Sequence, residues 1–217
     1  YRDWVGTIVK RRLHREPEVE ECVKIPEPIM KTLTVDWDQD HLAYYLKVAD
    51  EFAHWYRDRR PSERLSNLML LLARISAVEA AGNIPQRTPK TGQGWRGGLT
   101  SKQRATVDLA ARFTAEGHKT VVFAESPRLL ERLESGLKAR GIDSIMFHGE
   151  INKRTRSHDL DQHWRYGKTP VLLASYGTMQ AGWDLYQGTR AILANRSWSD
   201  REENQAIYRL LRPQTTN

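Results

Sequence analysis

The stretch "KTVVFAESPRLLERLESGLKARGIDSIMFHG", residues 119–149, decides the fold class. It opens with an apolar run at 119–124, continues over 126–141 with apolar residues at helical spacing, and returns to an apolar run at 142–149. Serine and proline at the start of the middle segment, and glycine at its end, are typical helix boundaries. The stretch therefore predicts a strand, a helix and a second strand, the repeating unit of a parallel sheet.

The alternation of strands and helices continues on both sides of this unit. Strands that are apolar on both faces and are separated by helices predict a parallel sheet with helices on both sides. Function in such folds lies in loops at the carboxyl ends of the strands. The further predicted elements are helices at 101–117, 152–167 and 200–211 and strands at 169–175 and 189–195.

The part of the chain before residue 101 has a different pattern. Apolar residues recur at helical spacing over 36–58 and 62–82, and the stretch 28–37 alternates apolar and polar residues like a strand. A segment rich in Pro, Gly and Thr follows and predicts a flexible linker. The expected parts are a mainly helical bridge and insertion at 1–82, the linker at 83–100 and the α/β domain at 101–217.

Composition limits the class of protein. Of the 217 residues, 39% are hydrophobic and 28% charged, which is typical of a folded globular protein. A net charge of +7 favours an anionic partner such as nucleic acid. The single cysteine excludes an internal disulfide and a cysteine-rich zinc site. We therefore expect an intracellular location, cytoplasmic or at the nucleoid, or nuclear in a eukaryote, for a piece of a longer protein without a membrane span.

Polar loops follow the predicted strands in a fixed order. Each is rich in small, hydroxyl, amide or charged groups, which bind phosphates through side chains and free backbone N–H groups. These loops are "ESPR" at 125–128, "HGE" at 148–150, "SYGTMQAGWDL" at 175–185 and "NRSWSDREENQ" at 195–205. One longer stretch overlaps each loop: "VVFAES" at 121–126, "FHGEINKRTR" at 147–156, "VLLASYGTMQAGWDL" at 171–185 and "NQAIYRLLRPQ" at 204–214.

Together these stretches resemble the second RecA-like domain of superfamily 2 helicases, and the pattern is most similar to that of Swi/Snf-type DNA translocases. In order, they resemble motif IV, the following strand with its His-Gly turn and basic helix, motif V and motif VI. Residues 8–48 resemble the family's bridge between its two RecA-like domains. The chain departs from the Swi/Snf pattern at Met179, Gln180 and Asp184, where consecutive glycines and an asparagine are commoner.

The resemblance implies a nucleotide site at motifs V and VI. Arg209 and Arg212 lie three positions apart, on one face of the predicted helix. In the family such arginines face the triphosphate of ATP, and planar guanidinium groups stabilise a phosphoryl group in transit. Gln205 would orient the phosphates, and Gly182 and Asp184 would lie by the nucleotide, with Asp184 on the ribose or a finger arginine. Without the resemblance, arginines at a helix end simply complement its dipole.

The resemblance also implies contacts with DNA, most often double-stranded. Basic and hydroxyl side chains at the strand ends would neutralise or bind backbone phosphates without reading the base sequence. The alternative for each is a solvated surface charge or an ordinary turn residue. The expected nucleic-acid contacts are Ser126, Arg128, His148, Lys153, Arg154, Ser175 and Thr178.

Other site types find little support in the sequence. The stretch "QHWRYGKT" at 162–169 ends like a phosphate-binding loop, but it precedes a strand instead of following one. ATP phosphates and Mg²⁺ are therefore expected to be held by an N-terminal RecA-like domain of the same protein, and this chain alone is expected to be inactive. Five of the seven histidines have no metal-ligand spacing with acidic or cysteine partners, so no metal site is expected; they are His41, His54, His118, His158 and His163.

Two other functions remain open from the sequence. One is a RecA-like module that binds nucleic acid or a protein without catalysis, although such a module has no need of the arginine pair. The other is a helicase that separates strands of RNA or DNA. The helical insertion favours the duplex translocase, because compact RNA helicases usually join their two domains by a short linker.

Overall fold

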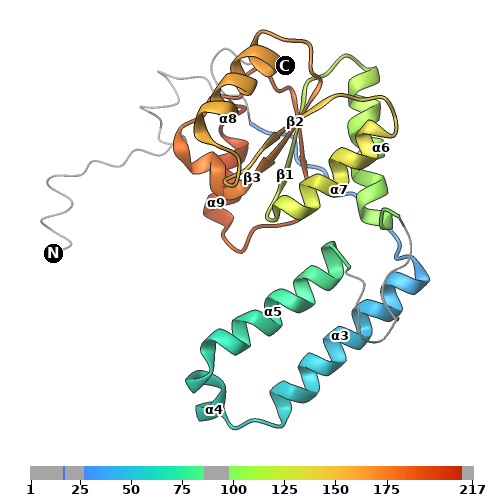
Figure 1. Ribbon diagram of the computed structural model, residues 1–217, viewed down its shortest axis with the longest axis vertical. Coiled ribbons are helices and arrows are strands. Elements are labelled where there is room, and N and C mark those ends of the chain that lie inside the picture. The colour runs from blue at the N-terminus through green and yellow to red at the C-terminus, as the bar shows by residue number, and fades with distance from the viewer. Residues whose placement is uncertain (1–16, 18–26, 86–97, 212–217) are drawn as a thin grey trace, which may run out of the picture.

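The computed structural model describes residues 17, 27–85 and 98–211 (Figure 1). An α/β domain carries a sheet with helices on both sides, and a pair of long helices projects from it. In Figure 1, α6 and α7 lie on one side of the sheet, and α8 and α9 lie on the other. The predicted architecture, a parallel sheet between two helical layers preceded by a helical insertion, is therefore confirmed.

The sheet consists of four parallel strands in the order β2-β3-β1-β4. Ala124 pairs with Ser175, and Phe147 pairs with Ala174, so three neighbouring strands end at nearly the same level. Because their carboxyl ends are aligned, the loops that follow them start at one edge of the sheet. The strands are β1 (Thr120–Ala124), β2 (Ser144–Phe147), β3 (Val171–Ser175) and β4 (Arg190–Leu193).

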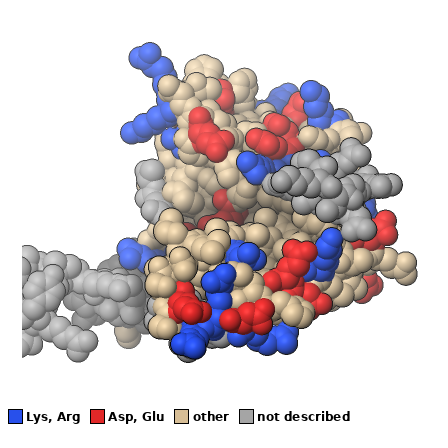
Figure 2. All heavy atoms as spheres, turned by 60° about the horizontal axis from the view of Figure 1, so that its bottom comes forward, with Lys and Arg blue, Asp and Glu red and all other residues tan. Residues whose placement is uncertain are grey.

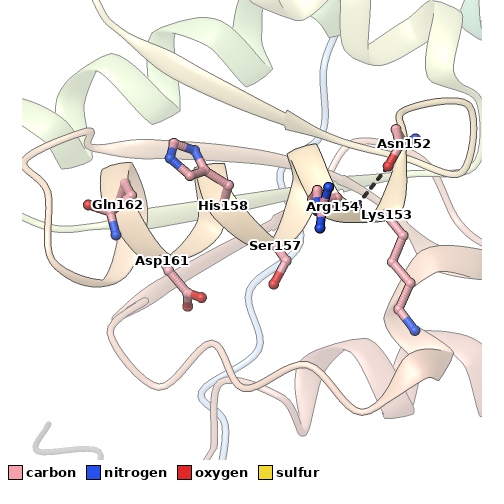
Figure 3. A pocket seen from close by; sticks show the side chains of 7 residues that line it. All are labelled: Asn152, Lys153, Arg154, Ser157, His158, Asp161 and Gln162. Carbon is pink, nitrogen blue, oxygen red and sulfur yellow. Dashed lines mark hydrogen bonds between the residues drawn. The ribbon is translucent and has the colours of Figure 1, made fainter.

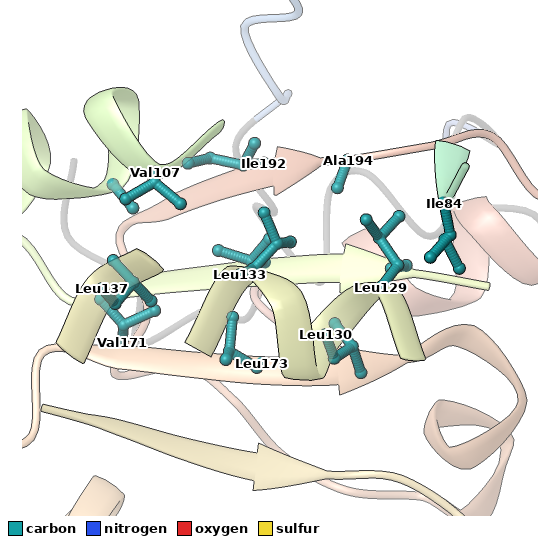
Figure 4. Close-up of a cluster of buried hydrophobic side chains, with 13 residues drawn as sticks. Ile84, Val107, Leu129, Leu130, Leu133, Leu137, Val171, Leu173, Ile192 and Ala194 are labelled. Carbon is teal, nitrogen blue, oxygen red and sulfur yellow. The ribbon is translucent and has the colours of Figure 1, made fainter. Parts of the chain in front are cut away.

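Both faces of the sheet are buried, as the apolar strands predict. Successive side chains of a strand point to opposite faces, so Val122 and Ala124 pack on one side while Val121 and Phe123 pack on the other. On the first side, a row of leucines from α7 (Pro127–Lys138) covers the central strands together with α6 (Ser101–Ala115), as Figure 4 shows. The second side is closed by aromatic and apolar residues around the fully buried Trp164.

The opposite layer differs in detail from the sequence prediction. The single helix expected at 152–167 is an α-helix, α8 (Lys153–Asp159), followed by a π-helical turn, η1 (Leu160–Arg165). The loop after β3 forms a 3₁₀-helix, η2 (Tyr176–Ala181), which the polar sequence did not predict. The last helix, α9 (Asp200–Ile207), ends four residues early, because i to i−3 hydrogen bonds tighten its end and turn Leu210 into the core.

The N-terminal part is helical, as expected, except in one place. Its helices are α3 (Gln39–Arg57), α4 (Pro61–Ser66) and α5 (Leu68–Asn83). The strand predicted at 28–37 is wrong: this described stretch forms no strand, and Ile29 is 87% exposed. An alternating pattern forms a strand only when a neighbouring edge accepts its hydrogen bonds. Of the linker predicted at 83–100, residues 86–97 lie outside the described part.

Polar contacts join the helical insertion to the α/β domain. The Asp38 carboxylate, just before α3, accepts hydrogen bonds from the Ser101 N–H (2.7 Å) and hydroxyl (2.8 Å) and from Arg104. Burial favours the neutral acid, but these hydrogen bonds outweigh it and lower the pKa of Asp38. Gln103 donates to the Asn83 carbonyl at 2.8 Å. The two ends of the insertion are thus tied to the start of α6.

Among the described residues, no helix combines the length and the apolar character needed to cross a membrane.

Candidate nucleotide and nucleic-acid site

The carboxyl ends of three strands are tied together by Asn195. Its side-chain oxygen accepts a hydrogen bond from the Glu125 N–H at 3.0 Å, and its backbone oxygen accepts one from the Tyr176 hydroxyl at 2.7 Å. Glu125 follows β1, Tyr176 follows β3 and Asn195 follows β4. Burial and the nearby carboxylate of Glu203 raise the pKa of Tyr176, so the hydroxyl remains a donor. The polar loops therefore form one connected surface.

Motifs V and VI contact each other directly. Arg209, which follows α9, donates from Nε to the Met179 carbonyl of η2 at 3.2 Å, and its own carbonyl accepts from the Leu185 N–H at 3.0 Å. Gly182 ends η2 with φ of 78°, in the left-handed region that favours glycine. Met179 and Leu185 are fully buried beneath this contact. The tertiary structure thus brings Gly182 and Arg209 to one region.

Arg209 differs from Arg196, another arginine of this edge, in its partners. It is half-buried, and no described carboxylate forms an ion pair with it. Arg196, in contrast, holds the buried carboxylate of Glu203 at 2.7 Å, and hydrogen bonds with that group raise the pKa of Arg196. Arg196 is thus fixed within the fold, whereas the positive charge of Arg209 remains available to an anion.

The other predicted nucleotide residues surround this contact. The backbone carbonyl of Asp184 accepts a hydrogen bond from Arg165 at 3.2 Å, and Arg165 is itself paired with Asp161 at 2.8 Å. The π-turn η1 therefore supports the loop that carries Asp184. Gln205 is half-buried on α9, one turn before Arg209. Arg212 lies outside the described residues.

The predicted nucleic-acid residues fall into two groups. The side chains of Arg128, Lys153 and Arg154 are exposed, and Ser126 is half-buried at the start of α7. The remaining three are buried, with exposed fractions of 7 to 8%. The hydroxyls of Ser175 and Thr178 are hydrogen-bonded to each other at 2.5 Å. His148 follows β2, and its Nδ1 has no hydrogen-bond partner in the described part of the chain.

Figure 2 shows the distribution of charge on one face of the molecule. On this face, lysine and arginine side chains are interspersed with aspartate and glutamate and do not gather into one basic patch. The positive net charge is therefore not concentrated here. No broad positive surface is present on the described part of this side.

A family model for the helicase conserved C-terminal domain matches residues 101–214, more than half of the chain. The chain belongs to the helicase C-terminal domain family. Human "DNA excision repair protein ERCC-6-like" is 28% identical over 109 residues, which are 49% of this chain and 9% of that protein. "DNA repair protein RAD5B" of Arabidopsis thaliana is 27% identical over 99 residues, 46% of this chain and 8% of the relative. The chain thus spans about a tenth of the length of these relatives.

Solved structures agree with the fold of this helicase domain. The match to the "Sulfolobus solfataricus SWI2/SNF2 ATPase core in complex with dsDNA" covers 100% of the present chain and 44% of the Sulfolobus chain, with TM-score 0.69 and 15% identity. The match to the "Sulfolobus solfataricus SWI2/SNF2 ATPase C-terminal domain" covers 73% of the present chain and 68% of the Sulfolobus chain, with TM-score 0.57 and 15% identity. The predicted resemblance to the second RecA-like domain of Swi/Snf-type proteins is confirmed.

The sequence patterns missed the residues that hold the site of this helicase domain in shape. The Glu203 carboxylate is 4% exposed and accepts hydrogen bonds from Arg196 and from the Ser197 N–H at 2.6 Å. Burial and three neighbouring glutamates raise the pKa of Glu125, against a hydrogen bond from Ser197. The composition of residues 195–205 predicted a polar loop. No spacing rule distinguishes a buried glutamate in such a loop from an exposed one.

A second cluster in the helicase domain was also missed. The ligand atoms of His158, Asp159 and His163 all lie within 4.8 Å of one another at the junction of α8 and η1. Two histidines five residues apart do not share a face of an α-helix, so their spacing did not predict a shared site. His158 also lines a hollow, which Figure 3 shows. Its lining residues are Asn152, Lys153, Arg154, Ser157, His158, Asp161 and Gln162.

Proposed function

We propose that this chain is the second motor domain of an ATP-dependent translocase that acts on double-stranded DNA. The observation that carries the proposal is the position of Arg209. It is anchored to the motif V loop through the Met179 carbonyl, and its charge has no carboxylate partner among the described residues. A half-buried, uncompensated guanidinium is costly unless an anion binds to it.

The anion that fits this position is the triphosphate of ATP, held between this domain and a first RecA-like domain of the same protein. Among the described residues, Arg209 forms a side-chain hydrogen bond only through Nε, so its two Nη groups would donate to phosphate oxygens. Arg212, three residues on, would supply a second guanidinium, and Gln205 would orient the phosphates. Gly182 and Asp184 would border the nucleotide. Mg²⁺ would be held by the first domain and would neutralise phosphate charge there.

DNA would bind along the exposed cations at the carboxyl edge of the sheet. Arg128, Lys153 and Arg154 are accessible and can neutralise backbone phosphates. One hydroxyl of the Ser175–Thr178 pair donates to the other, and both side chains are buried, so they would reach a phosphate only through their small exposed fractions. His148 would act in the same limited way or orient the turn. The Sulfolobus core, solved with double-stranded DNA, is the reason to choose duplex as the substrate.

ATP hydrolysis by the intact protein that contains this chain tests the proposal. The rate is measured without DNA, with single-stranded DNA and with duplex DNA. We expect duplex to stimulate hydrolysis, Arg209→Ala to reduce kcat by about 10²-fold and Arg212→Ala by about 10³-fold or more. Arg201→Ala, which removes an exposed arginine of α9, the helix just before Arg209, is the matched control and leaves kcat unchanged.

The other outcomes separate the alternatives. Hydrolysis that is absent under every condition, or that is indifferent to both arginines, refutes the motor and leaves a RecA-like binding module. Stimulation by single-stranded DNA or RNA alone would replace the duplex translocase with a strand-separating helicase. An intracellular location at DNA remains a prediction that follows from this function.

The DNA contacts are tested by the salt dependence of duplex binding to the chain. Lys153→Ala and Arg154→Ala should each weaken binding to all sequences alike and reduce the slope of log K against log salt by about 1. Lys168→Ala is the control, because this exposed lysine precedes β3, at the opposite edge of the sheet. Unchanged slopes in both variants would remove α8 from the DNA track.

A further inference from the structure

We propose that His158, Asp159 and His163 bind a divalent metal ion of the zinc class. The ion would sit at the junction of α8 and η1, outside the nucleotide site described above. Three features of the structure carry this proposal: the π-helical turn, the chemistry of the donor groups and the hollow beside them.

The π-turn is what brings the two histidines together. In a regular α-helix, side chains five positions apart point about 140° away from each other. In η1 the Tyr166 N–H bonds to the Asp161 carbonyl at 3.0 Å, an i to i−5 hydrogen bond that widens the turn. The rings of His158 and His163 consequently face each other edge to face, with centroids 6.3 Å apart. Such π-helical turns are rare and are frequent at functional sites.

The donor groups suit zinc and its neighbours in the periodic table. Two imidazoles and one carboxylate are typical ligands of Zn²⁺, Co²⁺ and Ni²⁺, whereas Mg²⁺ and Ca²⁺ prefer oxygen alone. His158 Nδ1 lies 3.4 Å from Asp159 Oδ1. Tetrahedral bonds of 2.0–2.1 Å to zinc place neighbouring ligands about 3.4 Å apart. Both histidines are exposed, so small side-chain rotations can bring His163 from the present limit of 4.8 Å to this spacing.

The hollow would give water access to the ion, because one of the three proposed ligands, His158, lines it. Figure 3 shows the side chain of His158 beside Gln162, on the same helical segment that lines the hollow. Three protein ligands and one open position would let water complete the coordination of the ion. The cations Lys153 and Arg154 line the other end of the same hollow.

Metal binding would stiffen the support of the motif V loop. The ion would clip the last turn of α8 to η1, and η1 carries Arg165, which donates to the Asp184 carbonyl at 3.2 Å. The same arginine is paired with Asp161 inside the turn. An ion bound by His158 and His163 would therefore restrain η1, whose Arg165 contacts the Asp184 carbonyl.

Calorimetric titration of the chain with Zn²⁺ tests the proposal. Co²⁺ is a second probe, because its visible absorption reports on its ligands. We expect His158→Gln and His163→Gln each to weaken the tightest site at least tenfold and to remove the Co²⁺ absorption band of that site. His54→Gln is the matched control, because His54 is an exposed histidine of another helix, α3. It should leave both signals unchanged.

Two results would overturn the proposal: equal Zn²⁺ affinity and stoichiometry in the wild type and both glutamine variants, or an equal loss in the His54→Gln control. Circular dichroism establishes that each variant is folded. If a glutamine variant fails to fold, Asp159→Asn takes its place, because it removes one ligand charge and leaves the side chain nearly unchanged in size.

Discussion

Glu203 holds the loop between β4 and α9 through its side-chain carboxylate. Its carboxylate is buried, and it accepts hydrogen bonds from Arg196 Nε at 2.7 and 2.8 Å and from the Ser197 N–H at 2.6 Å. Glu203→Gln should lower the free energy of unfolding by about 2 kcal/mol, because an amide nitrogen would face donors that need an acceptor. Urea denaturation measures this difference.

The control for this variant is Asp200→Asn. Asp200 also pairs with Arg196, at 3.3 Å, but its side chain is 87% exposed. Exposed ion pairs contribute little to stability, so this variant should unfold like the wild type. Equal losses in the two variants would mean that the charge of Arg196 is stabilised by any nearby carboxylate and that the buried position of Glu203 has no special weight.

Among the helical elements, the π-helical turn η1 requires a glycine, Gly167, just beyond its end. A Cβ added to Gly167 would lie 2.4 Å from the His163 carbonyl oxygen and 2.6 Å from that of Gln162, both in the backbone. Gly167→Ala should therefore cost about 2 kcal/mol or more of stability, because the end of the turn has to open. Thermal unfolding followed by circular dichroism measures the loss.

Gly149→Ala provides the comparison for this element. Gly149 also lies in a turn, but nothing lies within 4 Å of an added Cβ and its φ is not positive. The melting temperature of the Gly149→Ala variant should match that of the wild type. If Gly167→Ala melts at the same temperature as well, the turn is more deformable than its packing indicates.

At the scale of the whole molecule, the Asp38 carboxylate links the helical insertion to α6. The pKa of Asp38 lies below 3.8, so its contribution is present above that pH and is lost as the pH falls through the folded-state pKa. Asp38→Asn should cost about 1 kcal/mol at neutral pH. The difference from the wild type should shrink as the pH falls below 3.8.

Urea titrations of the two proteins between pH 7 and pH 3 test this dependence. Asp36→Asn, which changes an exposed carboxylate two residues away, is the control and should show no loss at neutral pH. A difference between Asp38→Asn and the wild type that stays constant over this range would show that the carboxylate charge does not hold the junction.

Local patterns in the sequence determined the elements and the order of the motifs. The apolar runs at 119–124 and 169–175 became strands buried on both faces, because a continuous apolar run has no solvent face. Pro127 begins a helix because its ring fixes φ, and Gly141 follows one because glycine adopts positive φ without strain. The residues of motifs V and VI were therefore readable before any contact between them was known.

Only the tertiary structure decided which of these residues meet. Asp38 and Ser101 lie 63 positions apart, and Tyr176 bonds to Asn195 across 19 positions, so no local preference predicts either contact. The stretch 28–37 had a strand pattern but gained no neighbouring strand. Strand order, the widened turn that joins the two histidines and the contact of Arg209 with Met179 all depend on packing between distant segments. Such packing is set by the whole core and leaves no periodic signal in the sequence.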